Sequence, residues 1–524
     1  MVVGEGFEPS KASPTDLQSV PFGHSGTPPL TKHTRETASP CFQGAAIYVP
    51  HPQNQSKKND PRARPHRQRF QILPTGRAFT TAKRKNPCYR DYVPILSVLM
   101  NQDTQSASSY GNAGTLPPGK IGRSLTLLLG LFFSLFLFAS SFSIALAQVS
   151  LGFCVILFLG IMFLDRPFPI SRELKPLFLA WGAYLAWLVL SSLVNPHPLK
   201  SLDNIREEWL LVILPIGVYL HSKKERSDRL IMVLATTLFL ISIYGVIQHF
   251  TGLRFSATQH IHAAGDSYRL SGNFSHPLTY GYYVVTATVF YLAYLVSSFR
   301  QHSFWNRLVL TGAVTAGLAA SILCNSRGPM LALVIGLLTI GGLLGRWRWT
   351  LAGLAALTVL VLLLSPGLLT VFSQRVLNDW QSDNPAGRLF IWRNSVNIAC
   401  DNPLLGCGPG NFGEAYRAHL PPDFKDHGAV GHAHDDFIHL AAVGGFPAMA
   451  LFVVFLGVAC RHFWRLSRAP GTSERTRALT LAALAASIAF VAASLTEAAF
   501  ADEELRQVLL ALWATSWAPY RSTD

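Results

Sequence analysis

The chain has 524 residues, of which 49% are hydrophobic and only 14% are charged. A soluble domain usually carries about 25% charged residues, so this composition excludes an ordinary soluble globular protein and favours a surface that faces lipid. The net charge is +15, but beyond the first hundred residues the positive charges lie in short stretches between apolar runs, so a membrane explains them better than a nucleic acid.

Residues 1–121 are predicted to form a disordered basic extension. This segment is rich in Pro, Ser, Thr, Lys and Arg and has no sustained apolar period, so it cannot bury enough surface to offset chain entropy. It also lacks the apolar segment of a signal peptide near Met1. The stretch GEGFEPSKASPTDLQSVPFGHSGTPP resembles a translated transfer-RNA gene, which favours a start at Met100 over a genuine cytoplasmic tail.

From residue 122 onward, apolar runs recur almost without interruption, and a bilayer core about 30 Å thick needs about 20 apolar residues of helix. The sequence therefore predicts an all-α polytopic membrane protein with about twelve transmembrane helices, nine in residues 122–365 and three in 437–524, the last followed by a short tail. The predicted spans are 122–138, 143–164, 176–194, 207–221, 230–250, 277–297, 307–324, 328–344, 349–365, 437–460, 479–497 and 503–519.

The Lys and Arg residues between these spans predict the orientation in the membrane. Successive connections alternate between two sides, and those of one side hold 16 Lys or Arg, against 5 in the short connections of the other. Cytoplasmic loops carry the excess of positive charge. Both termini are therefore predicted in the cytoplasm, and the long connection 366–436 on the outward face.

Three arginines on the outward side have no orienting role and lie at or near span boundaries: Arg206, Arg269 and Arg327. A charge at that depth is costly unless it is paired or hydrated. Interfacial snorkelling explains any one of them as well as a functional role does. Three of them on one side, beside a large loop, favour a function.

Residues 366–436 form the one long connection, and a connection of that length is usually functional or disordered. Within it, GRLFIWRNSVNIACDN is predicted as an amphipathic helix that ends before Pro403. Its apolar side is predicted to hold Leu389, Trp392, Val396 and Ile398 or Ala399.

The segment PLLGCGPGNFGEAY is predicted as a Gly-rich turn. Gly406, Gly408 and Gly410 could suggest a phosphate cradle, but the strand before it and the Lys-Ser/Thr after it that a P-loop needs are missing. Cys400 and Cys407 could form a disulfide on the outward side, although a sequence spacing cannot show that the two side chains meet.

The densest polar cluster is GHAHDDFIHL, which holds His432, His434, Asp435, Asp436 and His439. Three interpretations compete. Two histidines with carboxylates could bind a metal. The two aspartates could begin a helix, where the dipole favours negative charge. One histidine could act as a general base, since an unperturbed imidazole titrates at about pH 6.5.

Four segments together resemble the O-antigen ligase/polymerase superfamily of bacterial membrane glycosyltransferases. They occur in the family's order, at the matching places of the topology, and the likeness is greatest to O-antigen ligases. The segments are RLSGNFSHPLTYGYY (269–283), NSRGPMLAL (325–333), GRLFIWRNSV…NPLLGCGPGNF (387–412) and HAHDDFIHLAAVGGFPA (432–448).

This resemblance implies that a glycan moves from a polyprenyl diphosphate carrier to an acceptor hydroxyl, without a cofactor and without a required metal. His434, with Gly445 at the family's distance, matches the general base. Arg206 and Arg327 match arginines of the outward face, and guanidinium groups there could neutralise the leaving diphosphate.

The resemblance also suggests residues that bind substrate. They are Arg269, His276, Arg388, Arg393, His432 and Asp435. For Arg388 and Arg393, a structural pairing with Asp401 or Asp383 is an equal alternative.

The favoured function is an O-antigen ligase that joins the glycan to lipid A-core in the bacterial inner membrane, with its active site facing the periplasm. An O-antigen or exopolysaccharide polymerase of the same superfamily, or a protein O-oligosaccharyltransferase, would share the donor and differ in the acceptor. A transporter is the remaining alternative. Helices broken at the membrane midplane would mark that class, whereas the charges of this chain gather at the outward interface.

Overall fold

The computed structural model describes residues 120–165, 173–255, 263–264, 267–364, 387–422 and 430–517. The predicted extension 1–121, with Met100, lies outside these ranges except for its last two residues. Two parts of the predicted catalytic loop, 366–386 and 423–429, also lie outside them.

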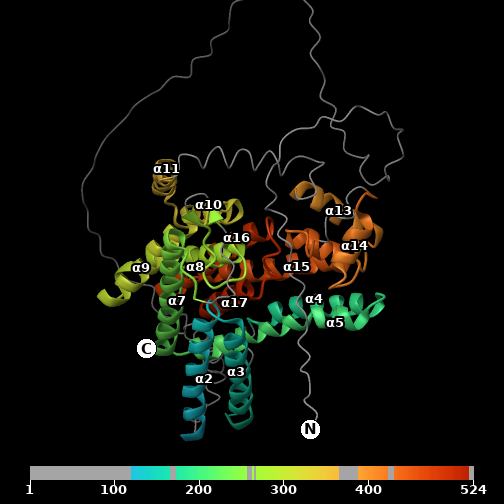
Figure 1. Cartoon of the computed structure of the whole chain (residues 1–524). Coiled ribbons are helices and arrows are strands. Elements are labelled where there is room, and N and C mark those ends of the chain that lie inside the picture. The colour runs from blue at the N-terminus through green and yellow to red at the C-terminus, as the bar shows by residue number, and fades with distance from the viewer. Residues whose placement is uncertain are drawn as a thin grey trace, which may run out of the picture. The chain divides into compact units, whose positions relative to one another are not determined.

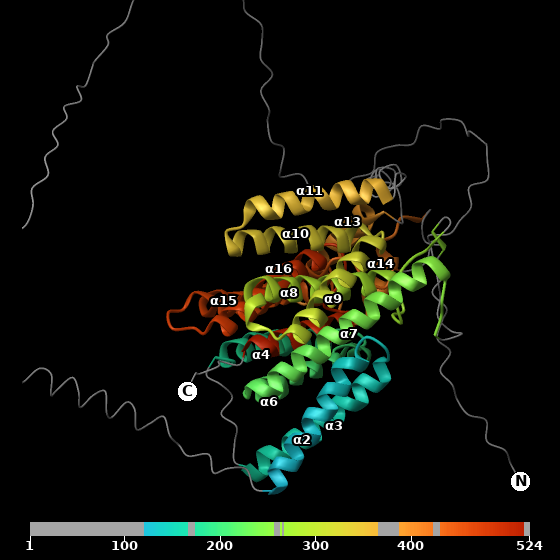
Figure 2. The ribbon, with the colours of Figure 1, turned by 90° about the vertical axis from the view of Figure 1, so that its left-hand side faces the viewer.

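The described part is almost entirely helical (Figures 1 and 2). Nine of its helices are long and apolar enough to cross a membrane, which confirms an all-α polytopic membrane protein. The total of twelve spans stays a prediction, because the predicted spans 207–221, 349–365 and 503–519 are not among these nine helices.

In chain order the elements are α2 (Lys120–Ala139), α3 (Ile144–Asp165), α4 (Lys175–Val194), α5 (Pro198–Asn204), η2 (Arg206–Val212), α6 (Ile213–His221), α7 (Lys224–Thr251), β1 (Ala263–Ala264), β2 (Ser267–Tyr268), α8 (Pro277–Ser298), η3 (Phe299–Gln301), α9 (Phe304–Leu323), α10 (Arg327–Leu344), α11 (Trp347–Leu364), α13 (Arg388–Asp401), α14 (Phe412–His419), α15 (Asp436–Arg468), α16 (Glu474–Ser494) and α17 (Glu503–Trp517). The three predicted spans outside the nine candidates fall on η2–α6, α11 and α17.

Helices α8 and α16 are the most buried of the candidate spans, and they pack against each other. α16 is rich in buried alanine, and small side chains allow membrane helices to approach closely. α8 contributes the fully buried Tyr280, Tyr282 and Tyr283. Each of their hydroxyls has a hydrogen-bond partner, which offsets the cost of burying it.

Several connections between the helices meet at one end of the bundle. Thr279, near the start of α8, donates to Asp502 in the α16–α17 connection at 2.9 Å. Lys200 of α5 pairs with Glu414 of α14 at 2.7 Å. The side chain of Asn411 contacts Ser201 at 3.1 Å. These contacts bring the α4–α6 connection, the α13–α15 segment and the start of α8 to the same end.

A buried ion pair joins η2 to α17. Arg506 Nη1 lies 3.2 Å from Glu208 Oε1, and both side chains are about nine-tenths buried. Trp181 of α4 donates to the other carboxylate oxygen at 3.1 Å, and Arg506 Nε donates to the carbonyl of Phe500 at 2.8 Å. Because all these groups are paired, the two charges are tolerated away from water.

Helix α15 is interrupted at Gly445, which has φ 76° and ψ 173°. Pro447 has no N–H to donate to the carbonyl of Val443. That carbonyl accepts instead from the backbone N–H of Gly408 at 2.9 Å, in the turn between α13 and α14. The turn therefore completes the hydrogen bonding that the break in α15 leaves open, which fixes the start of α15 and the residues just before it.

The Gly-rich turn has the geometry that its sequence predicts. Gly406, Gly408 and Gly410 have φ values of 63°, 86° and 76°, a region that residues with a Cβ rarely adopt. A Cβ on Gly406 would lie 2.5 Å from a backbone carbon of α15. Cys400 and Cys407 are both free thiols and do not form a disulfide. The thiol of Cys407 donates to the carbonyl of Gly408 at 3.8 Å.

Replacing Gly445 by alanine is expected to destabilise the protein by about 1–3 kcal/mol, because this backbone conformation is essentially restricted to glycine. The new Cβ would also overlap the carbonyl oxygen of Leu404. Thermal unfolding in detergent, followed by tryptophan fluorescence, measures the effect. The control is Gly457→Ala in the same helix, where a Cβ meets nothing within 4 Å. Equal unfolding temperatures for the two variants would contradict the role of the break.

Helix α13 ends at Asp401, before Asn402 and Pro403, as predicted. The predicted apolar side, however, was wrong in most positions. Leu389, Trp392 and Val396 are only partly buried, and the buried face is formed by Phe390, Ile391, Asn394, Ser395, Ile398 and Ala399.

Candidate active site

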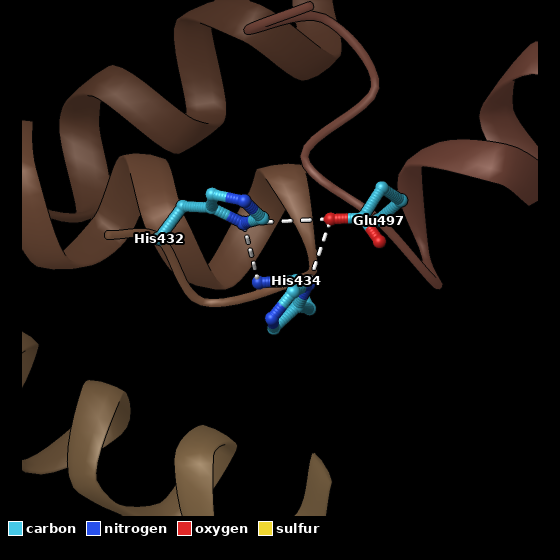
Figure 3. A group of neighbouring side chains, drawn as sticks. All are labelled: His432, His434 and Glu497. Carbon is cyan, nitrogen blue, oxygen red and sulfur yellow. Dashed lines mark hydrogen bonds and ion pairs between the residues drawn. The ribbon is translucent and has the colours of Figure 1, made fainter. Parts of the chain in front are cut away.

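His434 forms a short hydrogen bond with Glu497 (Figure 3), and the pair lies at the end of the bundle where the connections meet. Nδ1 of His434 lies 2.7 Å from Oε1 of Glu497, and Nδ1 of His432 lies 3.4 Å from the same oxygen. His434 and His432 come from the segment before α15, and Glu497 from the connection between α16 and α17. We call these three residues the His–Glu group.

The carboxylate of Glu497 is charged although it is buried. Only 6% of its side chain is exposed. Burial alone would raise its pKa, but the hydrogen bond from His434 and the charges of His434, His432 and Arg388 together outweigh it and lower the pKa to about 2. The carboxylate of Glu497 is therefore negatively charged at neutral pH, and that charge can orient and stabilise an adjacent imidazole.

The backbone of His434 has an unusual conformation. Its φ is 52°, and among the described residues only His434 and Asn325 are non-glycine residues with a positive φ. Such conformations cost energy and gather at functional sites. The strain is held by neighbours on both sides: Asp435 accepts from the N–H of Ile438 at 2.8 Å as the N-cap of α15, and the carbonyl of His434 accepts from Arg388 at 3.1 Å.

The hydrogen bonds assign the tautomer of His434. A carboxylate only accepts, so Nδ1 of His434 carries the proton that Glu497 binds, and in the neutral form of the ring Nε2 has the lone pair. Burial, and then the charge of His434, lower the pKa of His432 to about 4. His432 is therefore neutral near pH 7, and its Nδ1 accepts from the backbone N–H of His434 at 3.3 Å.

The His–Glu group also has the ligand types of a metal site. Its three donor atoms lie within 4.8 Å of one another, and two histidines with one carboxylate can bind zinc. Two ligand atoms at about 2.1 Å from a tetrahedral ion would be roughly 3.4 Å apart, whereas Nδ1 of His434 and Oε1 of Glu497 are 2.7 Å apart. The 2.7 Å spacing is that of a hydrogen bond, whereas the 3.4 Å between Nδ1 of His432 and Oε1 of Glu497 equals the spacing of two metal ligands.

Arg388, the first residue of α13, holds the group together. Its Nη1 donates to the carbonyls of His434 and Thr496, and its Nη2 lies 3.5 Å from Glu497. Of the two alternative partners, Asp401 binds His419 at 2.7 Å, and Asp383 lies outside the described residues. Arg388 therefore joins three segments that are distant in the sequence.

Arg327 and Arg269 lie close to this group. Gly328, the residue after Arg327, packs so near Thr496 that a Cβ would lie 3.0 Å from the Thr496 hydroxyl. Thr496 directly precedes Glu497, so the start of α10 lies beside the His–Glu group. Arg269 donates to Ser326 at 3.2 Å, which places a second guanidinium at the start of α10.

The remaining predicted residues are His276, Arg206 and Arg393. His276 caps α8, where its Nδ1 accepts from the N–H of Leu278 at 3.2 Å, and its charge contributes to the lowered pKa of His432. Arg206 pairs with Asp203 at 3.1 Å and is mostly exposed. Arg393 is exposed on α13. Within the described part of the chain, neither arginine contacts the His–Glu group.

Glu497 was not among the predicted site residues. The sequence analysis placed it as the last residue of the span 479–497, but α16 ends at Ser494. The available signal was a lone carboxylate at the end of an apolar run, which is costly unless it is paired. No motif indicated that its partner would be His434, 63 residues earlier in the chain.

Residues 312–453 match a family model described as O-antigen ligase. The match runs from α9 into α15 and contains Arg327, Arg388, His432 and His434, whereas Glu497 lies beyond it. It confirms the resemblance to the O-antigen ligase/polymerase superfamily. A search of curated proteins finds no match to the sequence.

Proposed function

We propose that this protein, whose residues 312–453 match a family model described as O-antigen ligase, transfers a glycan from a polyprenyl diphosphate carrier to a hydroxyl of lipid A-core. The observation that carries the proposal is the hydrogen bond of His434 with a charged, buried Glu497. This pair lies at an end of the helical bundle, where a lipid-tethered diphosphate and a water-exposed acceptor can meet.

In the proposed reaction the acceptor hydroxyl oxygen attacks the anomeric carbon of the donor glycan. The bond from that carbon to the diphosphate oxygen breaks, and Nε2 of His434 takes the hydroxyl proton. Glu497 stabilises the imidazolium that forms, as a buried carboxylate does for the histidine of a catalytic triad. A single displacement inverts the configuration of the sugar. General-base help of this kind contributes roughly 10²–10⁴-fold.

The diphosphate leaves with increasing negative charge, and arginine is suited to bind it because its guanidinium stays charged and pairs with phosphate oxygens. Arg327 and Arg269, at the start of α10 beside the His–Glu group, are proposed to hold the diphosphate. Arg206 is proposed to contribute from η2, where most of its side chain is free to reach a ligand. Arg388 is engaged with Glu497 and two carbonyls, so it is proposed to position the base.

The excess of Lys and Arg on the opposite connections supports a site on the periplasmic face of the inner membrane, with both termini in the cytoplasm. A polymerase or a protein O-oligosaccharyltransferase would use the same donor and the same base. The acceptor therefore decides among these enzymes, and it must be determined by experiment.

The test is glycan transfer by purified full-length protein in proteoliposomes. The donor is a polyprenyl-diphosphate glycan, and the acceptors are lipid A-core, a second donor glycan or a serine-containing protein. Transfer to lipid A-core alone is expected, and transfer only to the second glycan would show a polymerase instead. The rate in EDTA is expected to equal the rate without it. Loss of activity in EDTA, restored by Zn²⁺, would contradict the role of His434 as a base and favour a metal site at the His–Glu group.

A further inference from the structure

A large apolar cavity lies between α8, α9, α10 and the start of α11. Its volume is about 990 Å³, at the upper end of the range for small-molecule sites. Its apolar wall includes Leu292, Leu318, Leu337, Ile340 and Leu344. α11 packs mainly on α10 (Figure 2), and the cavity occupies the space beside it.

This cavity is distant from the His–Glu group. α10 begins at Arg327, beside that group, and ends at Leu344, on the cavity wall. Its 18 residues correspond to about 27 Å of helix at a rise of 1.5 Å per residue. The mouth of the cavity therefore lies near the opposite surface of the membrane, which the excess of positive charge marks as cytoplasmic.

Two arginines and two tryptophans surround the mouth of the cavity. Arg346, Trp347, Arg348 and Trp349 are all exposed and line it. Neither guanidinium has a hydrogen bond or ion pair with another residue of the described ranges. Tryptophan favours the membrane–water interface, and basic groups beside apolar clefts between membrane helices bind anionic lipid head groups. The mouth therefore offers charge to a phosphate, and the interior offers apolar surface to an acyl chain.

We propose that this cavity binds an anionic phospholipid of the cytoplasmic leaflet. The phosphate lies between Arg346 and Arg348, and one acyl chain fills the space between α8, α10 and α11. The polyprenyl donor does not suit this position, because its diphosphate must reach the His–Glu group at the other end of α10. A zwitterionic phospholipid offers the same chains without the net charge that the two arginines attract.

The first test compares lipid binding to purified full-length protein by native mass spectrometry. Phosphatidylglycerol and phosphatidylcholine with identical acyl chains are titrated separately. Wild-type protein is expected to bind phosphatidylglycerol more tightly. In the double variant Arg346→Gln/Arg348→Gln, the ratio of the affinity for phosphatidylglycerol to that for phosphatidylcholine is expected to fall roughly tenfold. Each basic side chain near a membrane surface adds substantially to the binding of anionic lipid. The control Arg300→Gln/Arg477→Gln removes two exposed arginines outside the cavity lining.

The second test fills the cavity without changing charge. Gly353 lines it, and a Cβ there meets nothing within 4 Å, so Gly353→Phe can be accommodated. This variant is expected to lower the occupancy of phosphatidylglycerol severalfold, whereas Gly457→Phe, at another open position, leaves it unchanged. The proposal is overturned if the arginine variant keeps its preference, if Gly353→Phe binds as wild type does, or if polyprenyl phosphate displaces phosphatidylglycerol at equal concentration.

Discussion

Replacing His434 by asparagine is expected to lower the turnover of glycan transfer by about 10²–10⁴-fold, because the variant has no group that accepts the hydroxyl proton. Asparagine is the suitable replacement, since it tolerates a positive φ better than most residues. The φ of 52° at this position makes alanine a poorer choice, because lost activity could then reflect a displaced segment. The measurement is the initial rate in proteoliposomes at saturating donor.

The control for this variant is His197→Ala. His197 is also a histidine of a connection at this end of the bundle, and it is exposed, with its ring 4.0 Å from Glu414. This variant is expected to transfer glycan at the wild-type rate. If His434→Asn folds normally and keeps full turnover, His434 is not the base.

Replacing Glu497 by glutamine is expected to lower turnover by about 10²–10⁴-fold, because a neutral amide can donate to Nδ1 of His434 and favour the tautomer with its proton on Nε2. In that tautomer Nε2 has no lone pair for the acceptor proton. The change keeps the size of the side chain, so the KM for the donor is expected to change little. A fall in kcat at nearly constant KM separates this effect from a general loss of binding.

Asp502→Asn is the matched control for Glu497→Gln, since Asp502 lies on the same connection. Burial raises the pKa of Asp502 to about 7, so its carboxyl is partly protonated at neutral pH and an amide resembles that form. Asparagine can also keep a hydrogen bond with Thr279. Turnover is expected to stay near the wild-type value. Equal losses in the two variants would show that any buried carboxyl of this connection is needed for stability, and would remove the specific role of Glu497.

Apolar length sufficed to predict most of the membrane helices, because lipid leaves few ways to satisfy a backbone. The start of α15 was also predictable from local chemistry. Asp435 caps it, and Asp436 lies in its first turn. The position of His434 beside this cap follows from the sequence, but its hydrogen bond with Glu497 depends on how α15 and α16 pack, which no local pattern encodes.

The face of α13 was mispredicted for a related reason. A search for the most apolar side selects Trp392 and Leu389, yet the buried side contains Asn394 and Ser395. Their polar atoms donate to backbone carbonyls one turn earlier, at 3.1 Å for Asn394 and 2.7 Å for Ser395. These local hydrogen bonds remove the cost of burying the two side chains, so hydrophobicity alone is a poor guide to this helix.

The ion pair of Glu208 and Arg506 restricts which substitutions can be accepted at these two positions during evolution. The two positions are separated by 298 residues along the chain, yet losing either partner alone would leave a charge isolated in a medium of low dielectric constant, at a cost of about 3–5 kcal/mol. A single substitution at either position would therefore be selected against, while a joint replacement by two apolar residues would be tolerated. Among descendants of this gene, the pair is expected to be kept whole or lost whole.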